Sequence, residues 1–192
     1  MNIYLVRHGQ TDWNKNNLMQ GQTDVELNET GESQAIQTAQ KLKDFQLSLI
    51  YSSPLKRTIR TANIIKGNSN LDIILDERLK ERSFGDFEGQ NNVGFKKYWN
   101  YKANLSDNKV EPIQLLFRRV YIFLEELEKK YKNNDINILL VSHNGTSLAI
   151  SSIINGAVPD NIFEYNMKPC EYRIFNEVNL DKWRKNYGRN KI

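Results

Sequence analysis

The sequence predicts an α/β protein in which helices cover both faces of a mostly parallel central sheet, giving a three-layer α/β/α sandwich. Short apolar runs alternate with segments of helical periodicity, and two of these runs end in a histidine that a glycine closely follows. The chain of 192 residues is also long enough for one compact domain with a substantial core. The runs typical of strands cover 3–6, 49–51, 71–75, 136–141 and 172–178.

Four segments between or after these runs carry apolar residues at helical spacing. Ser53 is a favourable N-cap for the second segment, with Pro54 at its first helical position. Pro112 opens the longest segment, which runs to about Lys132. Because strands and helices alternate, most of the strands are expected to be parallel. The predicted helices cover about 31–45, 54–65, 112–132 and 146–155.

The middle of the chain is its least regular part. Residues 79–89 are irregular and charged, and 90–111 is poorly patterned. The aromatic residues of 95–101 have three interpretations: a small cap over a pocket, an amphipathic helix packed on the domain, or a dimer contact. We expect a single domain over 1–180 that carries a small helical cap insertion at about 90–111, followed by a basic tail over 181–192.

Composition and charge narrow the class of protein. The net charge of +4 comes from 27 basic and 23 acidic residues. A basic tail without a recognised binding module predicts a solvated, frayed terminus rather than nucleic-acid binding. The single Cys170 suits a reducing compartment, and neither a signal peptide nor a run of roughly 18 apolar residues is found, so we expect a cytoplasmic protein without membrane contact. The late basic residues are Lys182, Arg184, Lys185, Arg189 and Lys191.

Polar side chains gather where the predicted strands end. His8 follows the first strand, Arg57 lies in the first helical turn after the second, and His143 follows the fourth. The carboxyl ends of parallel strands meet at one sheet edge, so these side chains should lie together with Arg7 and with backbone N–H groups of nearby helix starts. Such a site favours an anion, and arginine suits a phosphate. Two histidines without a cysteine or carboxylate cluster are a poor zinc site.

Four ordered blocks carry a specific resemblance. The blocks are Arg-His-Gly-Gln-Thr-Asp-Trp-Asn at 7–14, Ser-Ser-Pro-Leu-Lys-Arg-Thr at 52–58 with Thr-Ala at 61–62, Glu81 with Phe-Gly at 84–85 and Glu-Gly at 88–89, and Val-Ser-His-Asn-Gly at 141–145. In this order and spacing the chain resembles the histidine phosphatase superfamily, and more narrowly its phosphoglycerate mutase-like branch. The resemblance extends from the first strand to the helix after the second histidine.

The resemblance implies a role for each matching residue. His8 would be the nucleophile that becomes phosphorylated, with Arg7, Arg57 and His143 around the transferred phosphoryl group. Glu81 would protonate the departing alcohol and later take a proton from the attacking water. Neither a metal ion nor another cofactor is then needed. The resemblance also places Asn14, Gln20, Gly21 and Asn144 along the phosphate and substrate pocket, on weaker motif matches.

The acceptor of the phosphoryl group distinguishes two kinds of enzyme in this branch: phosphatases transfer it to water, and mutases transfer it to another sugar acid. Mutases of the family carry a longer insertion over the site, whereas 89–143 leaves little chain for a lid, so a phosphatase acting on a small phosphorylated metabolite is favoured. Arg82 points the other way, because family mutases also have Glu-Arg there and use the arginine on substrate. Val-Glu-Pro at 110–112 and Asn144 depart from the family's usual Gly-Glu-Ser and Ser-His-Gly-Gly.

Two alternatives to the phosphatase remain. A phosphoglycerate mutase would need 2,3-bisphosphoglycerate as cofactor, and a catalytically silent module would bind a phosphate ligand or a protein without turnover. The protein is expected to be a monomer or a homodimer.

Overall fold

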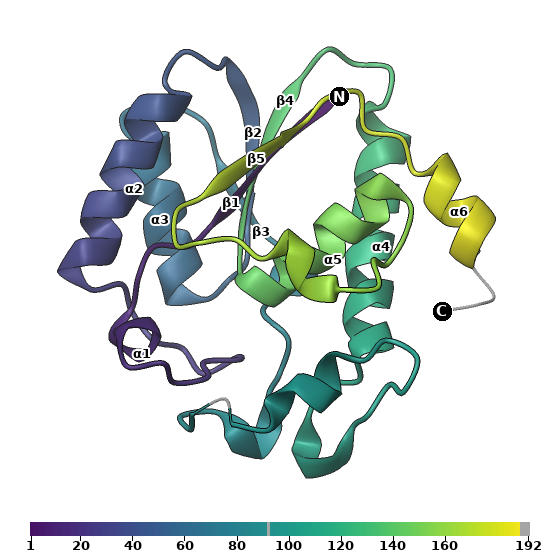
Figure 1. The fold of residues 1–192 in the computed structure, drawn as a ribbon. Coiled ribbons are helices and arrows are strands. Elements are labelled where there is room, and N and C mark those ends of the chain that lie inside the picture. Colours follow the sequence, from purple (N-terminus) through teal and green to yellow (C-terminus); the bar gives the residue numbers. More distant parts are fainter. Residues whose placement is uncertain (92, 189–192) are drawn as a thin grey trace.

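The computed structural model describes residues 1–91 and 93–188. Its strands are β1 (Asn2–Arg7), β2 (Leu47–Ser52), β3 (Ile73–Leu75), β4 (Asn137–Ser142) and β5 (Tyr172–Phe175). They form one five-stranded sheet in the order β3-β2-β4-β1-β5 (Figure 1). The pairs β3–β2, β2–β4 and β4–β1 are parallel, and β5 joins β1 antiparallel at the edge. The predicted α/β class with a mostly parallel sheet is therefore confirmed.

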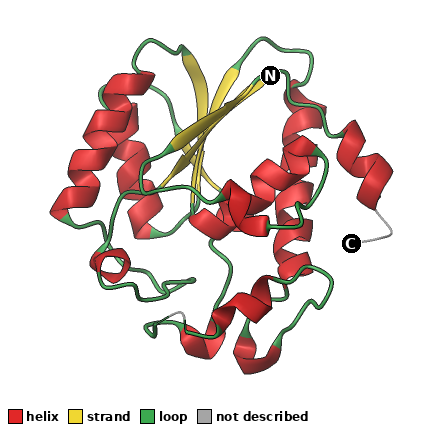
Figure 2. Ribbon diagram, in the orientation of Figure 1, coloured by secondary structure: helices red, strands yellow, loops and turns green. Residues whose placement is uncertain are grey.

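Helices cover both faces of this sheet (Figure 2). The helices are α1 (Asp12–Lys15), α2 (Glu29–Leu42), α3 (Lys56–Lys66), α4 (Ile113–Tyr131), α5 (Asn144–Asn155) and α6 (Asp181–Tyr187). α2 and α3 lie on one face, and α4 and α5 lie on the other. Short 3-10 helices cover Glu77–Leu79, Gly85–Phe87, Phe95–Trp99, Asp107–Lys109 and Ile162–Tyr165. None of the helices in the described residues is long and apolar enough to cross a membrane.

The alternation of side chains along β1 divides the core into two layers. Ile3 and Leu5 are fully buried in the cluster that α4 and α5 complete. Tyr4 and Val6 point the other way, into the cluster that includes residues of α2 and α3. This period of two is what a strand covered on both faces requires. β1 is thus packed on both faces and lies between β4 and β5 in the sheet, and His8 follows it directly.

The segment after residue 93 forms a small aromatic layer below the sheet. Phe95 and Tyr98 are 3% and 0% exposed and stack on each other with ring centroids 4.8 Å apart. Phe84 packs on Phe95 from outside the segment. The side chains of Phe95 and Tyr98 are buried within their own domain, so they are not available for the dimer contact considered above. The segment contains short 3-10 helices rather than an α-helix, and Asn92 lies outside the described residues.

The start of α3 differs from the sequence prediction. Ser53 and Pro54 do not begin the helix; Leu55 is its N-cap, with an extended backbone and no side-chain capping bond, and Lys56 is the first helical residue. The backbone N–H of Lys56 donates instead to Oδ1 of Asp24 over 2.7 Å. The prediction was wrong because a carboxylate from another loop caps this helix and the Ser53 hydroxyl has a different partner.

The predicted frayed tail was also wrong over residues 181–187. This segment forms α6, and Trp183 is fully buried between Phe117 and Tyr187. Arg184 forms ion pairs with Glu128 and with Asp181. Burial of one indole therefore anchors the basic segment to the domain. The remaining predicted tail residues, 189–192, lie outside the described residues.

Candidate active site

His8 and His143 follow neighbouring parallel strands, and the register of β1 and β4 pairs Arg7 with Ser142 just before them. The two imidazole rings therefore lie edge to face with their centroids 5.2 Å apart. Arg57, in the first turn of α3, donates from Nε to Nδ1 of His143 over 3.2 Å. The structure brings together the three side chains that the sequence places at one sheet edge.

His8 is buried and uncharged. Its Nδ1 lies 2.7 Å from the carbonyl oxygen of Gly9. Because a carbonyl can only accept, Nδ1 carries the proton and Nε2 keeps its lone pair. The pKa of His8 lies well below its ordinary value of 6.5, first because of burial and then because of the charges of Arg57 and Arg7. A neutral imidazole with a free Nε2 is the form that acts as a nucleophile.

The tautomer of His143 is the opposite one. The guanidinium of Arg57 can only donate, so Nδ1 of His143 accepts and Nε2 carries the proton. Nε2 then donates to the Ser53 hydroxyl oxygen over 2.8 Å. Burial is the main reason why the pKa of His143 also lies well below 6.5, followed by the charge of Arg57. Ser53 and Arg57 thus fix both the orientation and the protonation of this ring.

The guanidinium of Arg57 is buried and holds the loop around residue 21. Its Nη2 donates to the carbonyl of Gly21 over 2.7 Å, and its Nη1 donates to the carbonyl of Thr23 over 2.8 Å. Burial lowers the pKa of Arg57 to about 10, and the negative charge of Glu81 opposes this shift. Gly21 therefore contributes through its carbonyl oxygen, which orients Arg57.

Arg7 combines one backbone partner with one free donor. Its Nη1 donates to the carbonyl of Met167, and its buried Nε has no partner among the described residues. The side chain of Asn144 holds this partner segment, because its Oδ1 accepts from the N–H of Met167 and its Nδ2 donates to Asn166. The Asn144 side chain thus supports the segment that Arg7 contacts. Only the backbone N–H of Asn144 is then left for the predicted phosphate contact. A buried, unpaired guanidinium N–H favours an anion.

Glu81 sits at the N-terminus of α5. Its Oε2 accepts from the N–H of Gly145 over 3.0 Å, and its Oε1 accepts from the N–H groups of Thr146 and Arg82. Two of the helix-start N–H groups that the sequence assigns to a phosphate are therefore occupied by this carboxylate. A Cβ on Gly145 would lie 2.6 Å from Oε1 of Glu81 and 2.8 Å from the indole of Trp99, so only glycine fits there. The Trp99 indole and the Glu81 carboxylate thus both lie against Gly145.

Asn14 and Gln20 occupy different environments. Oδ1 of Asn14 accepts from the N–H and the hydroxyl of Thr11, which completes the N-terminal cap of α1. Gln20 is 6% exposed, and its Oε1 has no partner in the part of the chain that the structure describes. The orphaned oxygen of Gln20 is suited to a donor on a bound molecule.

Arg82 does not extend into open space. It is fully buried, and it donates from Nε to the carbonyl of Glu111 and from Nη1 to the carbonyl of Tyr98, each over 2.7 Å. Its guanidinium also lies over the ring of Trp99 at 5.1 Å. These contacts fasten the aromatic segment to the segment that carries Glu81. Burial lowers the pKa of Arg82 to about 10.

Glu88, to which no role was assigned from the sequence, organises the loop beside the site. Its Oε1 accepts from the N–H groups of Gln22 and Phe84, and its Oε2 accepts from the N–H of Thr23. The Gly21 backbone has a φ of +52°, and a Cβ there would overlap this carboxylate. The carboxylate of Glu88 therefore accepts from backbone N–H groups of a loop in which no strand supplies partners. Glu88 was visible in the sequence, but two of its partners, Gln22 and Thr23, are more than 60 residues away.

Ser53 and Arg119 are two further residues that sequence reasoning missed. Ser53 had a usable signal, since a polar residue at the carboxyl end of a strand is placed to meet the site. Arg119 donates to the carbonyls of Arg78, Lys80 and Glu81. It had no such signal, because nothing in one sequence tells which carbonyl groups a helix arginine meets. Within 1–91 and 93–188 no group of three or more His, Cys, Asp or Glu side chains is arranged to hold a metal ion.

The chain matches the family model of the histidine phosphatase superfamily, branch 1, over residues 3–186. It belongs to this family. The match confirms the resemblance read from the four sequence blocks. Together with relatives that are themselves named phosphatases, it shows the phosphatase class of enzyme.

Named relatives agree with this membership. The chain is 37% identical over 189 residues to the uncharacterized phosphatase PhoE of Bacillus subtilis, covering 98% of this chain and 94% of that one. A mycobacterial glucosyl-3-phosphoglycerate phosphatase superposes with a TM-score of 0.80 at 28% identity, covering 90% of this chain and 88% of the other. Phosphoserine phosphatase of Entamoeba histolytica, in complex with 3-phosphoglyceric acid, gives 0.76 at 30% identity, covering 91% and 89%.

The two buried neutral histidines predict acid sensitivity. Their pKa values are lower in the folded state than the ordinary 6.5, so the unfolded chain binds protons first as the pH falls. Stability is then lost below about pH 6.5, by up to about 1.4 kcal/mol per pH unit for each ring. Urea unfolding at about pH 7, 6 and 5.5 should show this loss, with a shallower slope for His8→Asn. Equal slopes in the two proteins would exclude a contribution from His8.

Proposed function

We propose that this protein is a phosphomonoesterase that hydrolyses small phosphorylated metabolites through a phosphohistidine on His8. The observation that carries the proposal is the free Nε2 of a buried, neutral His8 whose Nδ1 is held by Gly9. The charges of Arg57 and Arg7 act on this ring, and Arg7 keeps a buried N–H without a partner among the described residues. A nucleophile and cationic donors in one buried site suit phosphoryl transfer.

In the first step, Nε2 of His8 attacks the phosphorus and the bond to the alcohol oxygen breaks. The carboxyl group of Glu81 donates its proton to that oxygen, so a neutral alcohol leaves. The guanidinium groups of Arg7 and Arg57 stabilise the charge that spreads over the equatorial phosphoryl oxygens. The carbonyl oxygen of Gly9, which accepts from Nδ1–H of His8, stabilises the positive charge of the phosphorylated ring.

In the second step, a water molecule attacks the phosphohistidine. Glu81 is now a carboxylate and takes one proton from this water, so its carboxyl group is regenerated. The nitrogen–phosphorus bond breaks, inorganic phosphate leaves, and the electron pair returns to Nε2 of His8. The scheme assigns no step to a metal ion.

Two contacts of Arg82 favour a phosphatase over a mutase. A mutase would use this arginine on the substrate, but here its Nε and Nη1 donate to the carbonyls of Glu111 and Tyr98, and its buried Nη2 alone has no partner among the described residues. Because most of this guanidinium is engaged within the fold, we expect water to be the acceptor of the phosphoryl group. The named neighbours act on glucosyl-3-phosphoglycerate and phosphoserine, so phosphorylated sugar acids and hydroxy amino acids are the first substrates to test.

Phosphate release with EDTA present tests this function. Wild-type protein is incubated with para-nitrophenyl phosphate, phosphoserine and 3-phosphoglycerate, the last with and without 2,3-bisphosphoglycerate. The proposal predicts release of inorganic phosphate that EDTA does not reduce, and no dependence on the bisphosphate. Formation of 2-phosphoglycerate only when the bisphosphate is present would establish the mutase instead. Binding of phosphate without turnover of any ester would establish the silent module.

Two properties remain proposals beside the activity itself. We expect no bound cofactor, and we expect the protein to act in the cytoplasm, where small phosphorylated metabolites are formed. Metal analysis of the purified protein and fractionation of cells that express it test these two statements separately.

A further inference from the structure

We propose that Arg119 is a positioning residue for Glu81 and that it acts together with Glu111. The inference rests on the proposed function, because it concerns the group that protonates the leaving alcohol. Arg119 lies on α4, and its side chain is 18% exposed, while that of Glu111 is 11% exposed. Neither residue belongs to the four sequence blocks that carry the resemblance; Glu111 is the glutamate of Val-Glu-Pro at 110–112.

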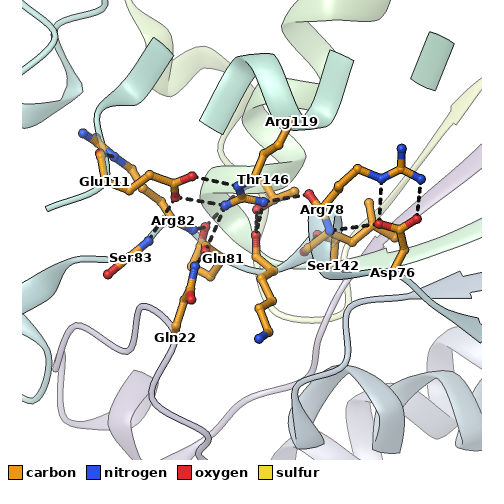
Figure 3. Close-up of polar contacts among 12 residues, drawn as sticks. Gln22, Asp76, Arg78, Glu81, Arg82, Ser83, Glu111, Arg119, Ser142 and Thr146 are labelled. Carbon is orange, nitrogen blue, oxygen red and sulfur yellow. Dashed lines mark hydrogen bonds and ion pairs between the residues drawn. The ribbon is translucent and has the colours of Figure 1, made fainter. Parts of the chain in front are cut away.

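The guanidinium of Arg119 uses all five of its N–H donors (Figure 3). Nε and Nη2 form a two-point contact with the carboxylate of Glu111, at 2.7 and 3.0 Å. Nη1 donates to the carbonyls of Arg78 and Lys80, each over 2.7 Å. The second hydrogen of Nη2 reaches the carbonyl of Glu81 over 3.1 Å. One planar group therefore holds three backbone oxygens at or before the proposed acid.

These backbone oxygens need side-chain partners. Lys80 and Glu81 belong to no helix or strand, and the single 3-10 turn over Glu77–Leu79 uses the carbonyls of Asp76 and Glu77, so no ladder satisfies the carbonyls of residues 78–81. Ser142 donates to the carbonyl of Leu79, and Thr146 shares the carbonyl of Lys80 with Arg119 (Figure 3). Gln22 shares the carbonyl of Glu81 with Arg119, as it donates from Nε2 over 3.0 Å. The path of this segment is thus set by side chains, and Arg119 supplies more of these bonds than any other residue named here.

Glu111 holds the segment from its other side. Its Oε2 accepts from the N–H of Ser83 over 3.2 Å, and its own N–H donates to the carbonyl of Ser83. Arg119 therefore fixes the backbone before and at Glu81, and Glu111 fixes it two residues later. The carboxylate also orients the fork of Arg119, since the two-point contact allows only one plane for the guanidinium. The pair acts as one clamp around the residue that carries the proposed proton.

Proton transfer is sensitive to this placement. A general acid must lie within hydrogen-bond reach of the leaving oxygen, and a shift of about 1 Å can cost about 100-fold in rate. Lysine cannot replace Arg119, because a single ammonium cannot hold Glu111 and three carbonyl oxygens in one plane. Loss of the clamp should therefore slow reactions that need the acid and spare those that do not.

The test compares kcat/KM for an alkyl phosphate, which needs a proton donor, with kcat/KM for para-nitrophenyl phosphate, which does not. Arg119→Lys and Glu111→Gln are expected to lower the ratio of the two values by about 10- to 100-fold. The matched control is Arg184→Lys, which weakens the ion pair with Glu128 at the other end of α4 and should leave the ratio unchanged. A ratio measured within each variant is insensitive to the amount of folded protein.

A double variant separates positioning from a general structural effect. If Arg119 acts through Glu81, Arg119→Lys should not lower the ratio further in a Glu81→Gln background. The inference is overturned if Arg119→Lys lowers both substrates equally, or if its effect on the ratio adds fully to that of Glu81→Gln. Failure of the proposed function looks different: wild-type protein would release no phosphate, or Glu81→Gln itself would leave the ratio unchanged.

Discussion

Replacing His8 with alanine is expected to abolish turnover of every phosphomonoester. The proposed reaction passes the phosphoryl group to Nε2, and alanine offers no atom that can accept it. The expected loss in kcat is about 1,000-fold or more, because the remaining groups can only orient the ester and stabilise charge. Phosphate release from para-nitrophenyl phosphate measures this loss.

His8→Asn is the matched control for this substitution. The asparagine Nδ2 can still donate to the Gly9 carbonyl, so the variant keeps the local hydrogen bond and lacks only the nucleophile. Both variants should still bind inorganic phosphate, which a rise in Tm with phosphate concentration would show. Turnover by either variant near the wild-type rate would rule out His8 as the nucleophile.

Replacing Glu81 with glutamine should separate substrates by their leaving groups. An alkyl alcohol leaves poorly without a proton, so its kcat/KM should fall by about 100- to 10,000-fold. Nitrophenolate leaves without protonation, so its kcat/KM should change much less. kcat/KM is the correct measure because it reports the steps up to formation of the phosphoenzyme, whereas kcat also contains the attack of water.

The nitrophenyl ester serves as an internal control for the state of the glutamine variant. An amide at this position would also place an NH2 group near the N–H donors of Gly145 and Thr146, which disturbs the start of α5. A disturbance of this kind would slow both esters alike. Equal losses on the two substrates would therefore count against Glu81 as the acid.

The central part of the fold could be predicted because its signals are local. The apolar runs of β1 and β4 are visible in the sequence, and a histidine directly follows each strand. The rule that parallel strands present their carboxyl ends at one edge then brings His8 and His143 together. Arg57 follows from the same rule, because α3 begins directly after β2.

Features that depend on distant partners could not be predicted. Asp24 caps α3 from 32 residues away, and Ser53 contacts His143 from 90 residues away. Trp183 anchors α6 through burial among aromatic residues of other elements, and the basic composition of the segment gave no hint of this. Glu81 was identified by its motif, yet its position in front of the α5 amides depends on the fold around it.

Trapping of the phosphoenzyme tests the central claim most directly. Protein mixed with para-nitrophenyl phosphate is quenched in alkali, in which phosphohistidine survives, digested and analysed by mass spectrometry. The account predicts one phosphoryl group on the peptide that contains His8, and none on that peptide in His8→Asn. A phosphoryl group on another residue would contradict it. So would hydrolysis by wild-type protein without a trapped phosphoenzyme, under conditions in which breakdown of the phosphoenzyme is rate-limiting.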